Sequence, residues 1–322
     1  MLKSAQVLSA KSDRVRRPLL GVAAILASVL LLSACGGQSG TGTEPQNPGS
    51  ESTSPGSLSD MLPSRYKDAG AIKFGTTPNN PPWSLHDDAA NKFSGFEPAL
   101  IGEMSKRLGV SADISGVQYE GLQIGLLAGK FDIMISSMHD TAVREKQMVF
   151  LDYANVGSAF LTAKGNPRGI VDLASACGEK LIVNPSSVQL SIIESYQPEC
   201  KKQGKDPIDY VTLPDQSASL LGVQGGKGAA FFGDKVALTY LAANASGDPV
   251  EVNSSTDAGV EPGFVGMAAQ IDNKDLIEAL QASLQSMIDD GTYASILSKY
   301  DFTFVGVDQA HINGTTTAKT AG

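Results

Sequence analysis

Short apolar runs alternate with longer amphipathic stretches along the chain from residue 61 onward. The apolar runs are predicted to be β-strands: Ala71–Gly75, Phe131–Ser136, Ser158–Ala163, Lys180–Val183, Ala229–Phe232 and Phe264–Ala269. The amphipathic stretches are predicted to be helices: Ala99–Leu108, Tyr119–Ala128, Val188–Lys202, Ser217–Gln224, Lys235–Ala243, Lys274–Asp289 and Thr292–Tyr300. Strands that alternate with helices of this length are typical of βαβ units with parallel sheets.

The length of this alternating region favours two sheets over one. Residues 62–306 number about 245, which is large for a single doubly wound sheet and suits two. We therefore predict an α/β fold of two lobes, each a mostly parallel sheet flanked by helices.

A polar cluster follows each of four predicted strands: Thr76–Trp83, Ser136–Arg144, Asn184–Gln189 and Gly233–Asp234. Ligands of open α/β sheets bind beyond the carboxyl ends of the strands. We therefore expect the four clusters to converge on one crevice, with two clusters from each lobe.

The amino terminus has the pattern of an export signal. Five basic residues precede Leu19, and Leu19–Leu32 is an apolar run of 14 residues. A membrane-spanning helix needs about 20 residues, so this run fits the apolar region of a signal peptide. It ends in Leu32-Ser33-Ala34-Cys35, the pattern of a bacterial lipobox, in which the cysteine is lipidated. We predict a lipoprotein signal peptide over 1–34 and lipidation of Cys35; the alternative is an ordinary signal peptide with a chance cysteine.

The segment after Cys35 has the composition of a flexible tether. In residues 36–60, 18 of 25 are Gly, Ser, Thr or Pro, and none is Lys or Arg. Such a composition predicts a flexible coil rather than a packed element. We assign residues 35–62 to the lipidated cysteine and this tether.

The formal charge of −9 over 322 residues combines two regions. Residues 1–34 hold five basic side chains and one acidic side chain, which leaves 20 Lys or Arg against 33 Asp or Glu, a balance of −13. A region this acidic, with no basic run, is not suited to neutralising phosphates. We therefore expect no nucleic-acid partner.

Cys177 and Cys200 are the remaining cysteines after Cys35. Outside the cytoplasm an isolated pair is expected to form a disulfide, which here would stabilise the fold by roughly 3 kcal/mol in the chain-entropy estimate. The three histidines have no ligand-like spacing to the cysteines, so we expect neither a metal nor another cofactor.

Several short motifs follow one another in a defined order along the chain. The first motif is the strand and loop 75–83, with Pro81-Pro82-Trp83, followed by Gly95-Phe96-Glu97 and Lys106-Arg107-Leu108-Gly109. The densest block is 121–146, which includes Leu126–Asp132 and Thr141–Lys146, and Ser186–Gln189, Phe232–Asp234 and Asp290–Tyr293 complete the series. Over roughly residues 66–305 the chain resembles the polar-amino-acid family of extracytoplasmic solute-binding proteins of ABC importers. This is solute-binding protein family 3, which has a type II periplasmic-binding-protein-like fold.

The resemblance implies a two-lobed clamp that captures an amino acid or a closely related compound and delivers it to a membrane permease. Lobe 1 would comprise 63–163 and 256–307, and lobe 2 would comprise 164–255. Two crossings, near Ala163–Gly165 and Ser254–Gly259, would form the hinge. We expect a monomer, lipid-anchored at the outer face of the cytoplasmic membrane, and have no functional account of the polar tail 308–322.

The resemblance also implies roles for individual residues. Arg144 would hold the ligand carboxylate through its planar fork, and Asp234 would hold the ammonium. The remaining candidates are Ser137 and His139 near these groups, Ser186 and Ser187 at a helix start in the other lobe, and Trp83 and Asn80 at the ligand side chain. Asn80 stands where many relatives have a stacking ring.

Each assignment has a plainer alternative. Arg144 could be a surface arginine, Asp234 and Ser187 simple helix caps, Trp83 a core residue and His139 a solvated loop residue. At the level of function, the alternatives are a dehydratase-type enzyme on the same fold and a ligand-sensing lobe of a signalling partner. We see no candidate acid or base beyond the residues with binding roles, so we expect no enzyme activity.

Overall fold

The computed structural model describes residues 57–320, without the side chains of Thr256 and of 318–320. The predicted signal peptide, Cys35 and residues 36–56 of the tether lie outside this range. The last predicted tether residues begin the folded region, because α1 (Leu58–Met61) and α2 (Ser64–Ala69) are helical. Within the described range no helix combines the length and the apolar character needed to cross a bilayer.

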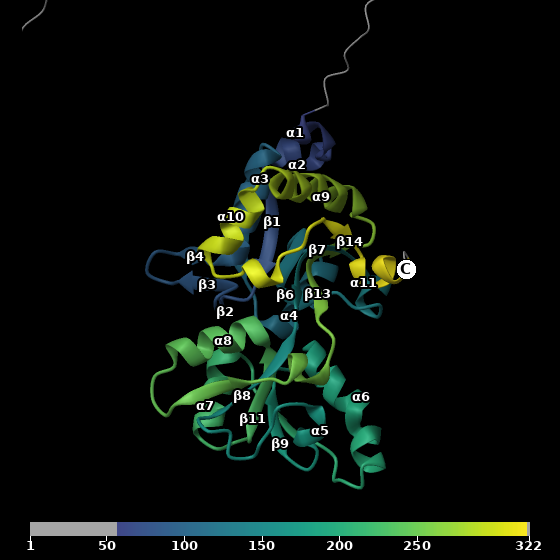
Figure 1. Ribbon diagram of the computed structural model, residues 1–322. Coiled ribbons are helices and arrows are strands. Elements are labelled where there is room, and N and C mark those ends of the chain that lie inside the picture. The colour runs from purple at the N-terminus through teal and green to yellow at the C-terminus, as the bar shows by residue number, and fades with distance from the viewer. Residues whose placement is uncertain (1–56, 321–322) are drawn as a thin grey trace, which may run out of the picture. The chain divides into compact units, whose positions relative to one another are not determined.

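The larger sheet of the described chain has six strands in the order β14-β7-β13-β6-β1-β5 (Figure 1). Its strands are β1 (Ala71–Thr76), β5 (Ser111–Gly116), β6 (Ile133–His139), β7 (Met148–Val156), β13 (Gly263–Gln270) and β14 (His311–Ile312). β1 runs parallel to β5 and β6, whereas β13 and β14 are antiparallel to their neighbours.

Alternate residues of β6 explain how helices cover both faces of this sheet. Ile133 and Ile135 belong to the core under α3 (Phe96–Arg107), α9 (Lys274–Asp289) and α10 (Thr292–Lys299). Met134 and Met138 belong to the core under α4 (Tyr119–Leu127). This period of two is that of a strand buried on both faces.

The smaller sheet has five strands, in the order β10-β9-β11-β8-β12 within residues 57–320. These are β8 (Ser158–Ala163), β9 (Lys180–Val183), β10 (Asp209–Thr212), β11 (Ala230–Asp234) and β12 (Val250–Asn253). Its helices are α5 (Leu173–Ala176), α6 (Val188–Lys202), α7 (Gln216–Gln224) and α8 (Lys235–Asn244). β9, β10 and β11 are parallel, and β8 is antiparallel to both of its neighbours, β11 and β12. Both sheets are therefore mixed, and the α/β class is confirmed.

A short three-stranded sheet follows β1 and was not predicted. It consists of β2 (Asn79–Asn80), β3 (Ser84–Asp87) and β4 (Lys92–Ser94). Strands of two to four residues leave too short a pattern to read from sequence. This sheet presents Asn79 and Asn80 at its edge.

The chain passes between the two large sheets at positions that differ in part from the prediction. The first crossing lies at Gly157, between β7 and β8, rather than near Ala163–Gly165. β8 pairs with β11 and β12, so residues 158–163 belong with the smaller sheet and not with lobe 1. Residues 148–163 are almost continuously apolar, so the pattern shows no boundary there. The second crossing contains η2 (Thr256–Gly259), within the predicted segment.

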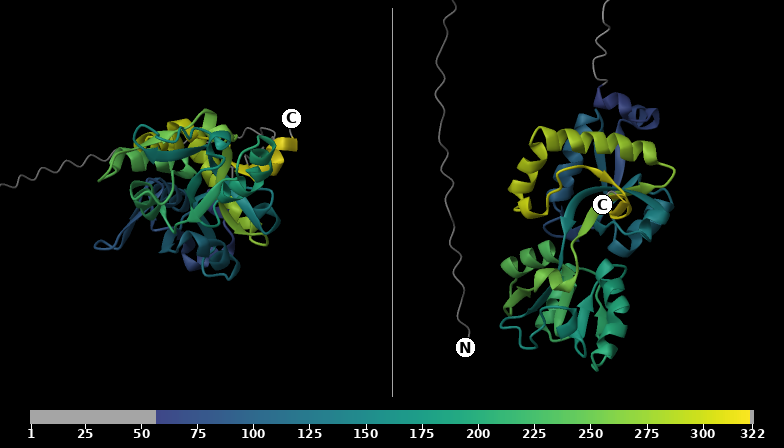
Figure 2. Two further views of the ribbon diagram at one scale, coloured as in Figure 1. Left: turned by 90° about the horizontal axis from the view of Figure 1, so that it is seen from below. Right: turned by 45° about the vertical axis from the view of Figure 1, so that its right-hand side comes forward.

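Two further features complete the fold. Cys177 and Cys200 form the predicted disulfide between α5 and α6. The segment 308–320, predicted as a polar tail, contributes β14 and α11 (Gly314–Thr320) beside β7, and Figure 2 shows it lying against the larger sheet. Its single short strand and polar helix have no apolar periodicity, so the sequence pattern did not predict them.

Candidate functional site

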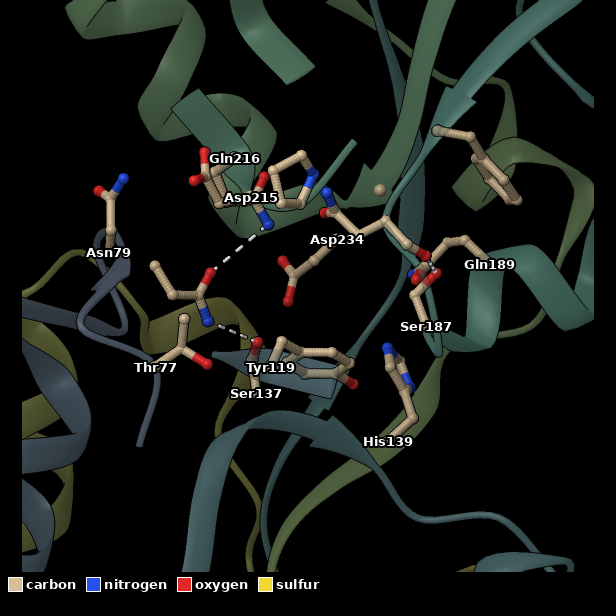
Figure 3. A pocket seen from close by; sticks show the side chains of 15 residues that line it. Thr77, Asn79, Tyr119, Ser137, His139, Ser187, Gln189, Asp215, Gln216 and Asp234 are labelled. Carbon is tan, nitrogen blue, oxygen red and sulfur yellow. Dashed lines mark hydrogen bonds between the residues drawn. The ribbon is translucent and has the colours of Figure 1, made fainter. Parts of the chain in front are cut away.

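A cavity lies between the two large sheets, with an empty volume of about 570 Å³ including its opening to solvent. All four predicted polar clusters contribute to its wall (Figure 3). The larger-sheet side supplies Thr77, Asn79, Asn80, Tyr119, Ser137 and His139, and the smaller-sheet side supplies Asn184, Ser187, Gln189, Pro214, Asp215, Gln216, Phe232, Gly233 and Asp234.

Asp234 lies at the carboxyl end of β11 and is only 7% exposed. Its Oδ1 caps α8 by accepting hydrogen bonds from the backbone N–H groups of Val236 at 2.7 Å and Ala237 at 3.1 Å. Its Oδ2 has no hydrogen-bond partner among the described residues. Burial raises the pKa of Asp234 to about 7, against the opposing effect of the capping bonds. Capping therefore uses one oxygen of Asp234 and leaves the other without a partner at the cavity among the described residues.

Glu97 is a buried carboxyl group behind the cavity wall, and no role was predicted for it. Its Oε1 accepts hydrogen bonds from the Ser137 N–H and the Tyr153 hydroxyl, each at 2.5 Å. Burial raises the pKa of Glu97 to about 7, and the nearby Asp234 adds to the rise. Glu97 thus fixes Ser137, whose backbone has a left-handed φ of 40° at the cavity.

His139 lines the cavity at the end of β6 and is 8% exposed. Burial, followed by the charge of Arg144, lowers the pKa of His139 to about 4. Nε2 of the ring has no partner within the described chain. His139 is therefore a neutral imidazole at neutral pH, not the cation that a ligand carboxylate would need.

Arg144 lies beside the cavity and is not among its described wall residues. Its Nη1 donates to the His139 carbonyl at 2.6 Å and its Nη2 donates to the Ser186 carbonyl at 2.9 Å. The guanidinium thereby joins the segment after β6 to the segment after β9. A guanidinium has five N–H donors, so these two bonds leave three for another acceptor.

Ser186 and Ser187 precede α6 and differ in position. Ser187 lines the cavity and caps α6, because its Oγ accepts from the Leu190 N–H at 3.2 Å. Ser186 is exposed, with a φ of 61°, and reaches the site through its carbonyl bond with Arg144. Of the two serines, Ser187 is the one on the described wall.

The family model for bacterial extracellular solute-binding proteins, family 3, matches residues 72–303. The chain belongs to this family. It is 30% identical over 242 residues to the lysine/arginine/ornithine-binding periplasmic protein of Escherichia coli, covering 73% of this chain and 89% of that protein. It is 25% identical over 240 residues to the L-cystine-binding protein TcyJ of Escherichia coli, covering 74% and 85% of the two chains.

A solved structure, an ancestral arginine-binding protein bound to arginine, matches this family 3 chain with a TM-score of 0.63 and 28% identity. The match covers 72% of this chain and 98% of that one. These relatives are amino-acid-binding proteins, in agreement with the predicted family and its extracytoplasmic setting.

Trp83 was predicted to cover the ligand side chain, but in this family 3 protein it is fully buried and is absent from the described cavity wall. Its ring packs edge-on against Phe96, Tyr153 and Phe302, at centroid separations of 5.8, 6.3 and 4.6 Å. Trp83 Nε1 forms no hydrogen bond within the described chain. The indole N–H nevertheless stabilises the ionised Asp234 carboxylate, and this opposes the rise of the Asp234 pKa. Trp83 therefore contacts the site from behind, as a core residue.

The end of the cavity away from Ser187 is lined by Asn80, which was predicted, and by Thr77, Asn79, Asp215 and Gln216, which were not predicted individually (Figure 3). Asn80 Nδ2 donates to Ser137 Oγ at 3.0 Å, and Gln216 Nε2 donates to Asn80 Oδ1 at 3.4 Å. Tyr119 adds an aromatic ring in the middle of the wall, between Ser137 and His139 (Figure 3). Gln216 and Tyr119 are the first residues of helices. The sequence pattern alone does not show whether a side chain at such a position faces the cavity. Residues 57–320 contain no cluster of three potential metal ligands.

Proposed function

We propose that this chain captures an amino acid or a closely related compound between its two lobes and delivers it to the permease of an ABC importer. Residues 1–34 would direct export, and lipidated Cys35 with the tether would hold a monomeric binding domain at the outer face of the cytoplasmic membrane. No covalent chemistry is needed, because binding between lobes stabilises the closed form by differential affinity.

The main support for this proposal is the state of the Asp234 carboxylate. Asp234 is buried at the cavity between two sheets, and its Oδ2 has no partner among the described residues. A buried carboxylate needs a compensating cation or hydrogen-bond donor, and an α-ammonium group supplies both.

Arg144 would hold the carboxylate of the same ligand. The three N–H donors not used by the carbonyls of His139 and Ser186 can form a charge-assisted pair with it. Ser187 at the start of α6 and Ser137 would add hydrogen bonds, while Asn80 would face the ligand side chain. An anion on the cavity wall and a cation bonded to the backbone next to that wall would together be complementary to a zwitterion.

The proposal is tested by titrating the purified protein with the twenty amino acids while following the fluorescence of its single tryptophan, Trp83, and its melting temperature. A binder at 100 times its dissociation constant should stabilise the fold by about 2.7 kcal/mol. A complete absence of shifts across the panel would contradict an amino-acid-binding function. Recovery of the amino acid unchanged after incubation distinguishes binding from a dehydratase activity.

A further inference from the structure

The proposed ligand orientation leaves one end of the cavity for the side chain. In Figure 3, Asp234 lies between an end with Ser187, Gln189 and His139 and an end with Asn79, Thr77 and Gln216. With the carboxylate toward Arg144 and Ser187 and the ammonium at Asp234, the ligand side chain extends toward Thr77 and Gln216. We name Thr77, Asn79, Asn80 and Gln216 the amide end.

The amide end offers no cation to an acidic side chain. The wall residues that the structure describes include no Lys or Arg, and His139, which lies at the opposite end, is held neutral by burial and by Arg144. The charged groups of the wall are the carboxylates Asp215 and Asp234. A second ligand carboxylate would lose its hydration there without gaining a counter-charge.

Gln216 supplies a hydrogen-bond acceptor that the protein leaves unused. Its Nε2 donates to Asn80 Oδ1 at 3.4 Å, whereas its Oε1 is buried and has no partner within residues 57–320. An apolar ligand side chain would leave that acceptor unsatisfied, which disfavours such ligands. The amide end therefore selects a side chain with N–H donors.

Thr77 supplies the complementary donor. Its Oγ1 accepts a hydrogen bond from Ser136 Oγ at 2.8 Å, so its own hydroxyl hydrogen remains to be donated. Thr77 is 5% exposed and lines the cavity. One acceptor and one donor at the same end match a group that has both N–H and C=O.

A cationic side chain would need Asp215, and this carboxylate is poorly placed for that role. Asp215 Oδ1 already caps α7 by accepting from the Ala218 N–H at 2.8 Å, and the residue is partly exposed. A partly exposed ion pair adds little binding free energy. The four residues of the amide end are themselves neutral, so they do not compensate the cost of removing a cation from water.

We infer that the cavity selects an α-amino acid whose side chain ends in an uncharged carboxamide, as in glutamine or asparagine, with Gln216 and Thr77 as specificity-determining residues. This inference rests on the proposed function, because it takes the orientation of the amino-acid backbone from it. The carboxamide N–H₂ donates to Gln216 Oε1, and its carbonyl accepts from Thr77.

The test is calorimetric titration of the purified protein with glutamine, asparagine, glutamate, lysine, arginine and norvaline at one pH. Glutamine or asparagine should bind on the order of tenfold or more tightly than the other four amino acids. This ratio corresponds to the loss of one hydrogen bond to a buried acceptor. Tighter binding of lysine, arginine, norvaline or glutamate overturns the inference and leaves amino-acid capture standing. Failure of every amino acid to bind overturns the proposed function together with the inference.

Variants of Gln216 locate the selectivity. Gln216→Leu should remove the advantage of glutamine over norvaline without weakening norvaline, and Gln216→Glu should shift the preference toward lysine. The matched control is Gln123→Leu, because Gln123 is an amide on α4 that bonds Gln147 outside the cavity. An unchanged ratio of glutamine to norvaline affinity in Gln216→Leu, with an unchanged melting temperature, contradicts the assignment.

Discussion

At the scale of single residues, the site depends on buried carboxyl groups with raised pKa values. Asp234 and Glu97 each have a pKa of about 7, and in both cases burial is the main cause. Glu97 is satisfied by the Ser137 N–H and the Tyr153 hydroxyl, whereas Asp234 Oδ2 has no partner in the described chain. We therefore propose different roles for the two residues: a structural role for Glu97 and ligand capture for Asp234.

The raised pKa of Asp234 predicts that ligand binding depends on pH. An ammonium binds the ionised carboxylate, which becomes the main form as pH rises through about 7. We expect affinity to fall by about tenfold per pH unit below pH 7 and to be nearly constant above it. Calorimetry between pH 5 and 8.5 checks this, and an affinity that does not vary over that range would contradict it.

Glu97 predicts a pH dependence of stability with a defined sign. Its folded pKa of about 7 is above its unfolded value of about 4.5, so its protonated form favours the folded state. This contribution is fully present below pH 4.5 and is lost as pH rises through about 7, an effect on the order of 3 kcal/mol. Urea unfolding at pH 5 and pH 8 measures the effect. The free energy of unfolding should differ less between the two pH values in Glu97→Gln than in the wild type. An identical difference in both proteins would refute this role.

At the scale of elements, the C-terminal segment binds the loop that carries Arg144. The Gly314 N–H donates to Asp152 Oδ2 at 2.8 Å, and the Thr315 N–H donates to Asp140 Oδ2 at 3.1 Å. Thr315 Oγ1 also donates to the Asp140 carbonyl at 2.8 Å. Asp140 directly follows His139, so β14 and α11 fix one side of the candidate site.

Thr315→Val should therefore destabilise the protein by about 1 kcal/mol, because it removes the bond to the Asp140 carbonyl. The matched control is Thr303→Val, at an exposed threonine whose side chain forms no hydrogen bond among the described residues. Chemical unfolding measures both variants. Equal stabilities would contradict a specific role for this contact.

The sequence predicted the long elements well, and the reasons for its failures are specific. Helices such as α6 and α9 are long enough to show a repeated amphipathic pattern. Their predicted bounds, Val188–Lys202 and Lys274–Asp289, match the structure. β8 was predicted with the bounds Ser158–Ala163 that the structure has, but β7 was not predicted. The boundary between the lobes was placed after β8 because only Gly157 divides the two strands.

The sequence predicted those parts of the candidate site that lie at strand ends or within the family motifs. Asp234, His139 and Ser187 lie at the cavity as the four polar clusters indicated. Glu97 and Gln216 were missed as site residues because their positions depend on tertiary packing: one reaches Ser137 from behind the wall, and the other reaches Asn80 from the opposite lobe. The ligand-binding roles themselves remain predictions.

At the scale of the whole molecule, the two crossings between sheets contact each other. Asp257 in the second crossing forms an ion pair with Lys235 at 2.8 Å and has a left-handed φ of 49°. A Cβ atom added to Gly157, in the first crossing, would lie 2.2 Å from Asp257 Oδ1. The two crossings are therefore closely packed at this point, and any side chain at 157 would have to displace the Asp257 side chain.

Gly157→Ala should displace Asp257 and weaken ligand binding without changing any residue of the cavity wall. Gly102→Ala is the matched control, because a Cβ at Gly102 in α3 meets no described atom within 4 Å. Calorimetry gives the affinity, and small-angle scattering with and without ligand gives the change in compactness. Unchanged affinity and compactness in Gly157→Ala would show that the packing of the crossing does not matter for closure.

The central claim is that the Asp234 charge holds the ammonium of an amino acid between the lobes. The most direct test is calorimetric titration of wild type and Asp234→Asn with the tightest-binding amino acid at pH 8. Asparagine can also cap a helix, so this variant retains the cap on α8 and removes the charge. We predict one ligand per wild-type chain and an affinity at least about thirtyfold weaker in the variant. Equal affinities for the two proteins would contradict the account.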